Sequence, residues 1–191
     1  MIGMSLSSLL LLIGFSSAAA DPAPEFNLEA FARAADECGD PRAISQAYES
    51  FRGTVLEVTE GDTIVVKIEP LFPALPDLKA LERPNPTTIQ LVSIDAPRGS
   101  GAAAHRARAE LASMVLGKNV AILVSPVQNT KSSLAGMVDV ADVDVAKELL
   151  AKGLVKYRYG GPYAIDWWME CHYKLAETHA KAARVGIWAE P

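Results

Sequence analysis

The sequence predicts an α+β fold in which β-strands come first and helices follow. Two β-branched, nearly alternating runs, Gly53–Thr59 and Thr63–Ile68, flank the corner Glu60–Asp62 and indicate a β-hairpin. Apolar residues at helical spacing predict helices over Ala102–Leu116 and Asp166–Ala183. Strands and helices that occupy separate parts of a chain are typical of the α+β class.

The remaining elements follow from the same patterns. We expect strands at Ile89–Ile94, Val120–Val124 and Leu134–Val140, and a short helix at Val145–Lys152 that Gly153 ends. With a leader removed, 191 residues are enough for one domain with a full hydrophobic core.

In the helix Ala102–Leu116, one side is apolar and the other is charged. The residues that we expect to face the core are Ala103, Ala107, Leu111, Met114 and Val115. Those that we expect to face solvent are His105, Arg106 and Arg108. His105 has no metal-ligand partner at helical spacing, so it is interpreted as a surface residue.

Two aspartates stand at strand ends. Asp62 begins the second hairpin strand, and Asp95 ends the run Ile89–Ile94 before Ala96 and Pro97, which cannot continue a ladder. If these strands are neighbours, the two carboxylates converge at one sheet edge and offer oxygen ligands for Ca²⁺. The alternative is that both are ordinary turn and loop residues.

Four stretches in consistent order carry a resemblance to a known family. They are Gly53–Thr63, Ile94–Pro97, Leu149–Val155 and Gly186–Trp188, and together they resemble the staphylococcal nuclease (thermonuclease) family over roughly residues 51–189. The resemblance implies a five-stranded β-barrel of the oligonucleotide/oligosaccharide-binding kind with about three packed helices. We assign this domain to residues 51–191.

The resemblance also implies a chemistry, Ca²⁺-dependent hydrolysis of phosphodiester bonds. The family uses two aspartates, a glutamate just after the second one, and two arginines. Asp62 and Asp95 match the aspartates, whereas Gln90 stands at the first arginine and Arg98 at the glutamate. Gln90 lacks the permanent charge and fork of arginine, and Arg98 reverses the charge of the residue that it replaces.

The second arginine of the family is also replaced. Ser132 takes its place, with Lys131 as the nearest cation if the register slips by one residue. Removal of one preorganised electrostatic group typically lowers the rate about 10²–10³-fold. We therefore expect an impaired catalyst, in which the guanidinium of Arg98 bridges Asp62 and Asp95 in place of a metal. No cofactor is expected in that case, and Ca²⁺ is expected if the site functions.

Aromatic residues near the C-terminus have two interpretations. Tyr157 and Tyr159 are candidate ligand contacts, since Tyr159 falls where the resemblance places a tyrosine beside a bound nucleotide. Trp167, Trp168 and Tyr173 are interpreted as filling the seam between a helix and the barrel, with a base-stacking platform as the alternative. We expect Trp188 to pack beneath the last helix.

A proline-rich segment, Glu69–Thr88, interrupts the domain as an insertion where the family has a tight hairpin. Its leucines and phenylalanine favour packing against the barrel, with a partner surface as the alternative.

The net charge of −5 and pI near 5.2 do not indicate a basic face for polyanions. A protein partner is therefore favoured over nucleic acid, and weak nucleic-acid binding through a local patch stays open.

The N-terminal region predicts export to the periplasm or the medium. Residues 1–20 contain an apolar run followed by small residues, as in a secretory signal peptide, although the run lacks a preceding Lys or Arg. An uncleaved tether is the alternative; after cleavage no membrane span is expected. Residues 21–50 are expected to form a helical extension, with helices at Glu25–Glu37 and Arg42–Tyr48.

Two cysteines, Cys38 and Cys171, are expected to form a disulfide in an oxidising compartment. Closure of so long a loop is worth on the order of 4 kcal/mol in the chain-entropy model. Two unpaired, buried thiols are the alternative.

These observations lead to two hypotheses for function. The first is a secreted, catalytically impaired protein of the thermonuclease fold that acts as a binding module. The second is an active, extracellular Ca²⁺-dependent nuclease in which Lys131 or Arg98 reaches the phosphate from another direction.

Overall fold

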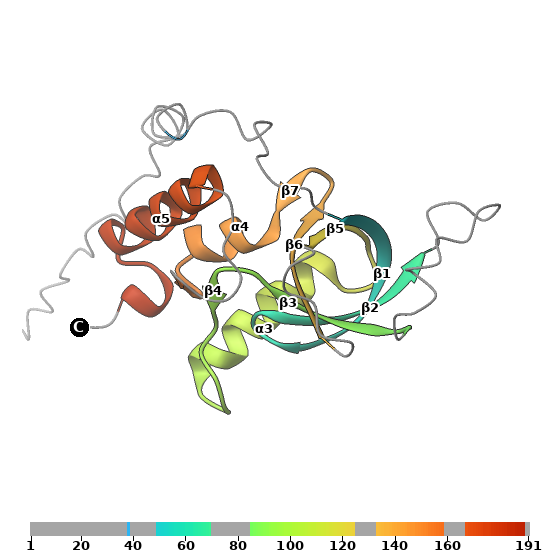
Figure 1. Ribbon diagram of the computed structural model, residues 1–191. Coiled ribbons are helices and arrows are strands. Elements are labelled where there is room, and N and C mark those ends of the chain that lie inside the picture. The colour runs from blue at the N-terminus through green and yellow to red at the C-terminus, as the bar shows by residue number, and fades with distance from the viewer. Residues whose placement is uncertain (1–37, 39–48, 70–84, 125–132, 159–166, 190–191) are drawn as a thin grey trace, which may run out of the picture.

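A closed, five-stranded mixed β-barrel with three helices on one side forms the domain (Figure 1). The computed structural model describes residue 38 and residues 49–69, 85–124, 133–158 and 167–189. The sheet order is β3-β2-β1-β5-β6-β7, and a further pairing of β3 with β6 closes the barrel. The predicted α+β class and barrel architecture are confirmed.

The structure gives the elements the following bounds. The strands are β1 (Glu49–Glu60), β2 (Thr63–Glu69), β3 (Thr87–Leu91), β4 (Ile94–Asp95), β5 (Asn119–Val124), β6 (Ser133–Val140), β7 (Val143–Asp144) and β8 (Lys156–Tyr157). The helices are α3 (Ala102–Val115), α4 (Val145–Ala151), α5 (Trp167–Ala182) and the 3₁₀ turn η2 (Gly186–Trp188).

The twelve-residue strand β1 is the centre of the sheet, since it pairs antiparallel with both β2 and β5. Its register with β2 shifts between Val55 and Glu57 and again before Glu60. Such β-bulges bend a strand and increase its twist, which is what closure of a small barrel requires. The predicted hairpin at Glu60–Asp62 is present, as the turn from β1 to β2.

One strand prediction is wrong. The run Ile89–Ile94 was expected to be one strand, but the chain leaves β3 after Leu91 and begins β4 at Ile94. Ser93 adopts a positive φ of 57°, and its carbonyl accepts a hydrogen bond from the N–H of Arg158. The turn at this residue redirects the chain from the barrel to a separate two-stranded ribbon with β8.

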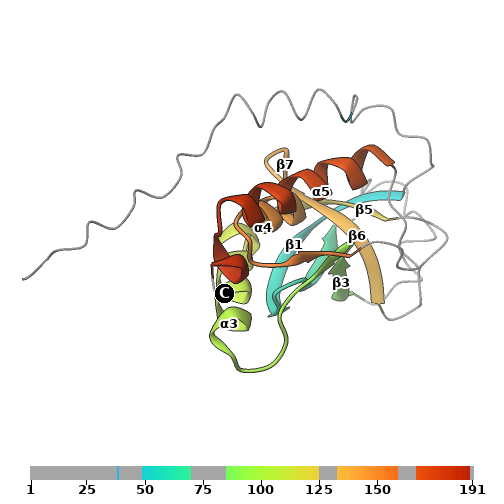
Figure 2. The same ribbon diagram turned by 90° about the vertical axis from the view of Figure 1, so that its left-hand side faces the viewer.

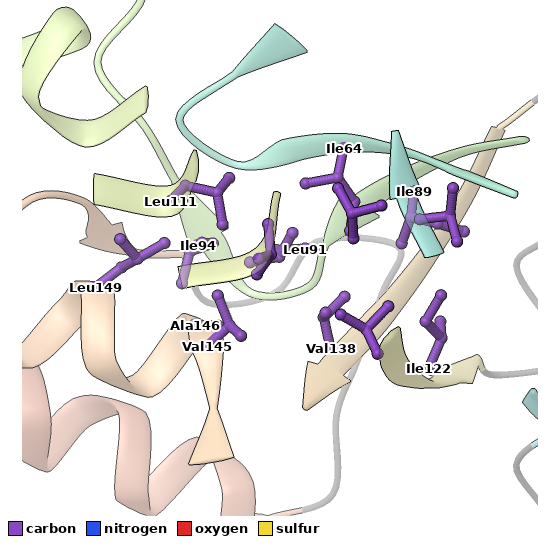
Figure 3. Close-up of a cluster of buried hydrophobic side chains, with 14 of the residues drawn as sticks. Ile64, Ile89, Leu91, Ile94, Leu111, Ile122, Val138, Val145, Ala146 and Leu149 are labelled. Carbon is purple, nitrogen blue, oxygen red and sulfur yellow. The ribbon is translucent and has the colours of Figure 1, made fainter. Parts of the chain in front are cut away.

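Branched aliphatic residues from the barrel, α3 and α4 fill the core (Figure 3). Ile64, Ile89 and Ile122 line the barrel interior, and Leu111 and Leu149 reach it from α3 and α4. At about 25 cal/mol per Å² of apolar surface removed from water, this burial is the main stabilising term of the fold. The alternating burial of β2 and β5 is the pattern by which the sequence indicated these strands.

The helix α3 presents a slightly different face to the core than predicted. Ala107, Leu111 and Val115 are buried as expected, but Ala104 is the buried residue of the first turn, whereas Ala103 and Met114 are half-buried. Three successive alanines begin this helix and give no contrast in hydrophobicity from which to choose a face. The predicted solvent-facing residues are exposed: His105, Arg106 and Arg108.

Figures 1 and 2 show α4 between the barrel and α5. Asp144 caps the first turn of α4 by accepting a hydrogen bond from the Lys147 N–H at 3.1 Å. Tyr173 of α5 is fully buried in the core, which confirms that it fills the seam. The side chains of Trp167 and Trp168 lie outside the described part of the structure.

The C-terminal turn η2 is fastened to the end of α4. Gly153 and Gly186 both have positive φ, 63° and 61°, and the Ile187 N–H donates to the Gly153 carbonyl at 2.7 Å. A Cβ added at Gly186 would overlap that same carbonyl oxygen. Trp188 is half-buried against this junction, close to the place predicted for it.

The disulfide between Cys38 and Cys171 is confirmed. It joins two residues 133 positions apart in sequence and attaches the segment before the barrel to α5. Its presence fits a secreted or periplasmic protein.

Several predictions concern residues outside the described ranges: the leader (1–20), the two N-terminal helices (25–37 and 42–48), and the greater part of the insertion (70–84). The end of that insertion is placed, because Asn85 exchanges two hydrogen bonds of 3.1 Å with the backbone of Ile68. Among the described helices, none is long and apolar enough to cross a membrane.

The junction of η2 with α4 yields a stability prediction. Gly186→Ala should lower the free energy of unfolding by about 2 kcal/mol more than Gly99→Ala, because the new methyl overlaps the Gly153 carbonyl. Gly99 is a matched control: it also has positive φ, 85°, but no atom lies within 4 Å of an added Cβ. Urea unfolding of both variants measures the difference, and equal losses would contradict the close packing.

Candidate functional site

The candidate site is built on the tight turn between β1 and β2. Gly61 lies in this turn, where a Cβ would stand 2.8 Å from the Cβ of Ala107 and 2.9 Å from that of Ala96. Only glycine allows the turn to pack so closely against α3 and the loop after β4. The turn therefore has a fixed position relative to both, and the next residue, Asp62, faces that loop.

Asp62 is fully buried, and hydrogen bonds meet both carboxylate oxygens. Oδ1 accepts from the hydroxyl of Thr63 at 2.8 Å. Oδ2 accepts from the N–H of Ala96 at 3.3 Å and from Nη2 of Arg98 at 2.7 Å. Its backbone carbonyl accepts from the N–H of Leu91 at 2.8 Å. A buried carboxylate needs such partners, because burial without them is costly.

Arg98 supplies the positive charge at this carboxylate. Besides Asp62, its guanidinium faces Glu60, with 3.9 Å between Nη1 and Oε2. The Arg98 side chain is 49% exposed, so the Glu60 contact is a surface interaction and the Asp62 contact is the substantial one. The predicted contact between Arg98 and Asp62 is present. The predicted contact with Asp95 is wrong, because the second carboxylate that faces Arg98 is that of Glu60.

Asp95 lies near Asp62 through the backbone, because Ala96, the next residue, donates to Asp62. The Asp95 side chain itself is exposed, on β4 opposite Lys156 of β8. Within the described ranges, Asp95 makes no ion pair with Arg98, and no group of three or more His, Cys, Asp or Glu side chains is arranged to hold a metal ion. Asp62, in the turn after β1, and Asp95, at the end of β4, are thus neighbours in the fold but lie in different environments.

Of the four remaining residues that the family resemblance singled out, the structure describes one. Gln90 is half-buried on β3, between Thr63 of β2 and Ala135 of β6. Its pairing with Thr63 places it beside the residue that follows Asp62. Ser132 and Lys131 lie outside the described residues, as does Tyr159.

Tyr157 lies on β8, paired with Ile94 in the same ribbon that carries Asp95. Its N–H donates to Oε1 of Glu177 on α5 at 2.9 Å, and the ammonium of Lys174 lies 5.9 Å from its ring centre. A cation at that distance over a ring is a favourable contact. Tyr157 is therefore close to the candidate site in the fold and held there by α5.

Sequence reasoning missed two residues of this region. Glu60 was identified only as part of the turn, although an acidic residue two positions before Asp62 is a signal for a second carboxylate. Glu177 also went unnoticed; its second oxygen accepts from Lys181 at 2.6 Å, and the i, i+4 spacing of these residues on a helix was visible.

In a comparison with protein families, residues 88–190, more than half of the chain, match the model described as "Staphylococcal nuclease homologue". The chain belongs to this family. Asp95 and Arg98 lie within the matched region of the staphylococcal nuclease homologue, whereas Asp62 and its turn precede it. A comparison with curated proteins found no match.

The ion pair between Arg98 and Asp62 yields the second prediction. Arg98→Ala should lower the free energy of unfolding by about 1.5–3 kcal/mol, because it removes a charged hydrogen bond from a buried carboxylate. Arg106→Ala is the matched control, since Arg106 is exposed on α3; its effect should stay within about 0.5 kcal/mol. Thermal and urea unfolding measure both values, and equal effects would show that Asp62 does not depend on Arg98.

Proposed function

We propose that this member of the staphylococcal nuclease family does not hydrolyse phosphodiester bonds and acts as a binding module. One observation carries the proposal: the guanidinium of Arg98 lies 2.7 Å from the buried oxygen of Asp62. This is a carboxylate that a catalytic metal would need.

The side chains around Asp62 do not suit a Ca²⁺ ion while Arg98 is present. Calcium takes six to eight oxygen ligands, and a guanidinium offers none. Oδ2 of Asp62 is already bonded to two donors and Oδ1 to a third. An ion placed there would also meet the positive charge of Arg98 at short range, which is unfavourable in a poorly solvated site.

The described site also offers few positive charges that could stabilise a reacting phosphate. Hydrolysis builds negative charge on the phosphorus centre, and preorganised cations usually offset it. Gln90, at the position of one such cation, is neutral. Around Asp62, the carboxylates of Glu60 and Asp62 face the single guanidinium of Arg98, so acidic groups outnumber the cation there.

The same balance of charge supports a protein partner over nucleic acid. A polyanion binds where lysines and arginines outnumber acids, and neither the site nor the whole chain, at −5, shows this excess. A protein partner has no such requirement. The disulfide supports a location outside the cytosol, in the periplasm or the medium.

A second candidate function is Ca²⁺-dependent nuclease activity. The observation in its favour is that Asp62 and Asp95 stand in adjoining loops, linked by the Ala96 N–H. It requires Arg98 to leave Asp62 and cations from elsewhere to reach the phosphate.

A single charge reversal yields the third prediction. Arg98→Glu removes the guanidinium and adds a carboxylate beside Asp62, so Ca²⁺ should bind in the micromolar range by calorimetry at neutral pH, where the wild-type protein gives no heat of binding. Arg106→Glu, on exposed α3, makes the same change of charge away from the site and should behave like the wild type.

Nuclease assays with single-stranded DNA and RNA, in Ca²⁺ and in chelator, complete this test. The proposal expects no Ca²⁺-dependent cleavage by the wild-type protein. Cleavage that chelator abolishes and Asp62→Asn removes would overturn it in favour of the second candidate.

A further inference from the structure

A cluster of aspartates lies at the hairpin of β6 and β7, on the side of the barrel that α4 covers. Ala141 and Asp142 form the turn with positive φ at both residues, 49° and 65°, as a two-residue hairpin turn of type I′ requires. On the two strands, Asp139 and Asp144 are directly paired in the antiparallel register. Their side chains therefore project from the same face, with Cβ atoms about 5 Å apart.

Asp144 has donors for one oxygen. Its Oδ1 accepts from the Lys147 N–H at 3.1 Å, as the cap of α4, and from the hydroxyl of the buried Tyr173 at 3.1 Å. This single carboxyl group thus fastens both α4 and α5 to the edge of the barrel.

Asp139 differs from Asp144 because one of its carboxylate oxygens, Oδ1, is buried and has no hydrogen-bond partner among the described residues. A buried carboxylate oxygen without a donor costs free energy, and a second carboxylate directly across the ladder adds repulsion. A proton on one of the two groups removes the repulsion and supplies the missing donor.

We propose that Asp139 and Asp144 share one proton, and that this acid pair holds α4 and α5 against the barrel more firmly in mildly acidic surroundings than in alkaline ones.

The pKa values agree with this geometry. The pKa of Asp144 is raised to about 6, mainly by burial and also by the charge of Asp139, against the lowering effect of its hydrogen bonds. Burial and the neighbouring Asp142 raise the pKa of Asp139. Because the two groups interact, the pair titrates in two steps that belong to both residues.

Among the described residues, Tyr173 and His172 are the other titratable groups next to the pair with a shifted pKa, and neither gains a charge that would offset the aspartates. Burial, followed by the charge of Asp144, raises the pKa of Tyr173, which stays a hydroxyl donor. Burial and the charge of Lys147 lower the pKa of His172, which stays neutral near pH 7. Lys147 and Glu148 are the charged residues of the first turn of α4. A bound cation is the other way to relieve three acids, but the described residues form no metal-ligand group.

The direction of the pH effect follows from proton counting. In the unfolded chain an aspartate titrates at about pH 4, whereas the pKa of Asp144 in the folded state is about 6. Between these values the folded state binds more protons than the unfolded state, so stability falls as pH rises through this window. The full shift of Asp144 corresponds to about 100-fold in the unfolding equilibrium constant.

Chemical unfolding of the disulfide-bonded protein between pH 4 and pH 8 tests the pair. Asp139→Asn and Asp144→Asn should each resemble the wild type near pH 4 and lower the unfolding constant at least tenfold at pH 8, because an amide carries no buried charge. The double variant should gain less than the sum of the two single effects, since each substitution removes its own buried charge but the repulsion is removed only once. Glu57→Gln, which removes an exposed carboxylate on β1, is the control and should give a pH-independent difference.

Tyr173→Phe should change the pH dependence of stability in the opposite direction. It removes a donor that favours the charged form of Asp144, so the loss of stability with rising pH should extend to higher pH. Carboxyl-carbon NMR of the wild-type protein gives a direct reading that depends on no variant: both residues should show the same two titration steps.

Three results would overturn the proposal. The first is an unchanged Asp144 titration in Asp139→Asn, and the second is single-variant effects that add in full; both would mean that the carboxyl groups act independently. The third is a Ca²⁺-induced rise in the wild-type unfolding midpoint that Asp139→Asn abolishes, which would assign the cluster to a cation.

Discussion

A buried negative charge at the turn between β1 and β2 constrains the whole candidate site. The closed barrel places Asp62 where water cannot reach its carboxylate, so the protein must provide donors from the surrounding chain. Those donors come from β2, the loop after β4, and Arg98, which together enclose the turn. The position of Arg98 is therefore a requirement of folding as much as a feature of the site.

This constraint is met in the protein by one of its own side chains. In a metal-binding version of such a barrel, an ion would neutralise the buried aspartate. Here a covalently attached guanidinium does so, which makes the charge balance independent of the supply of an ion. The rest of the barrel, from its branched aliphatic core to the pairing of β3 with β6, does not depend on which cation is used.

Sequence patterns predicted the elements whose structure depends on neighbouring residues. They failed where contacts with distant parts of the chain determine the structure. Alternating β-branched residues located the first hairpin, and the presence of just two cysteines predicted the disulfide. The break at Ser93 was not visible, because serine has no strong preference for positive φ and the turn is set by pairing with β8. Similarly, Arg98 was expected to pair with Asp95, but only the packing of Gly61 shows that Glu60 is presented to it.

The disulfide encloses almost the entire domain. Between Cys38 and Cys171 lie all eight described strands, α3 and α4. Reduction of the bond would detach Cys38 from α5 and leave the backbone that leads to β1 as its only covalent connection to the barrel.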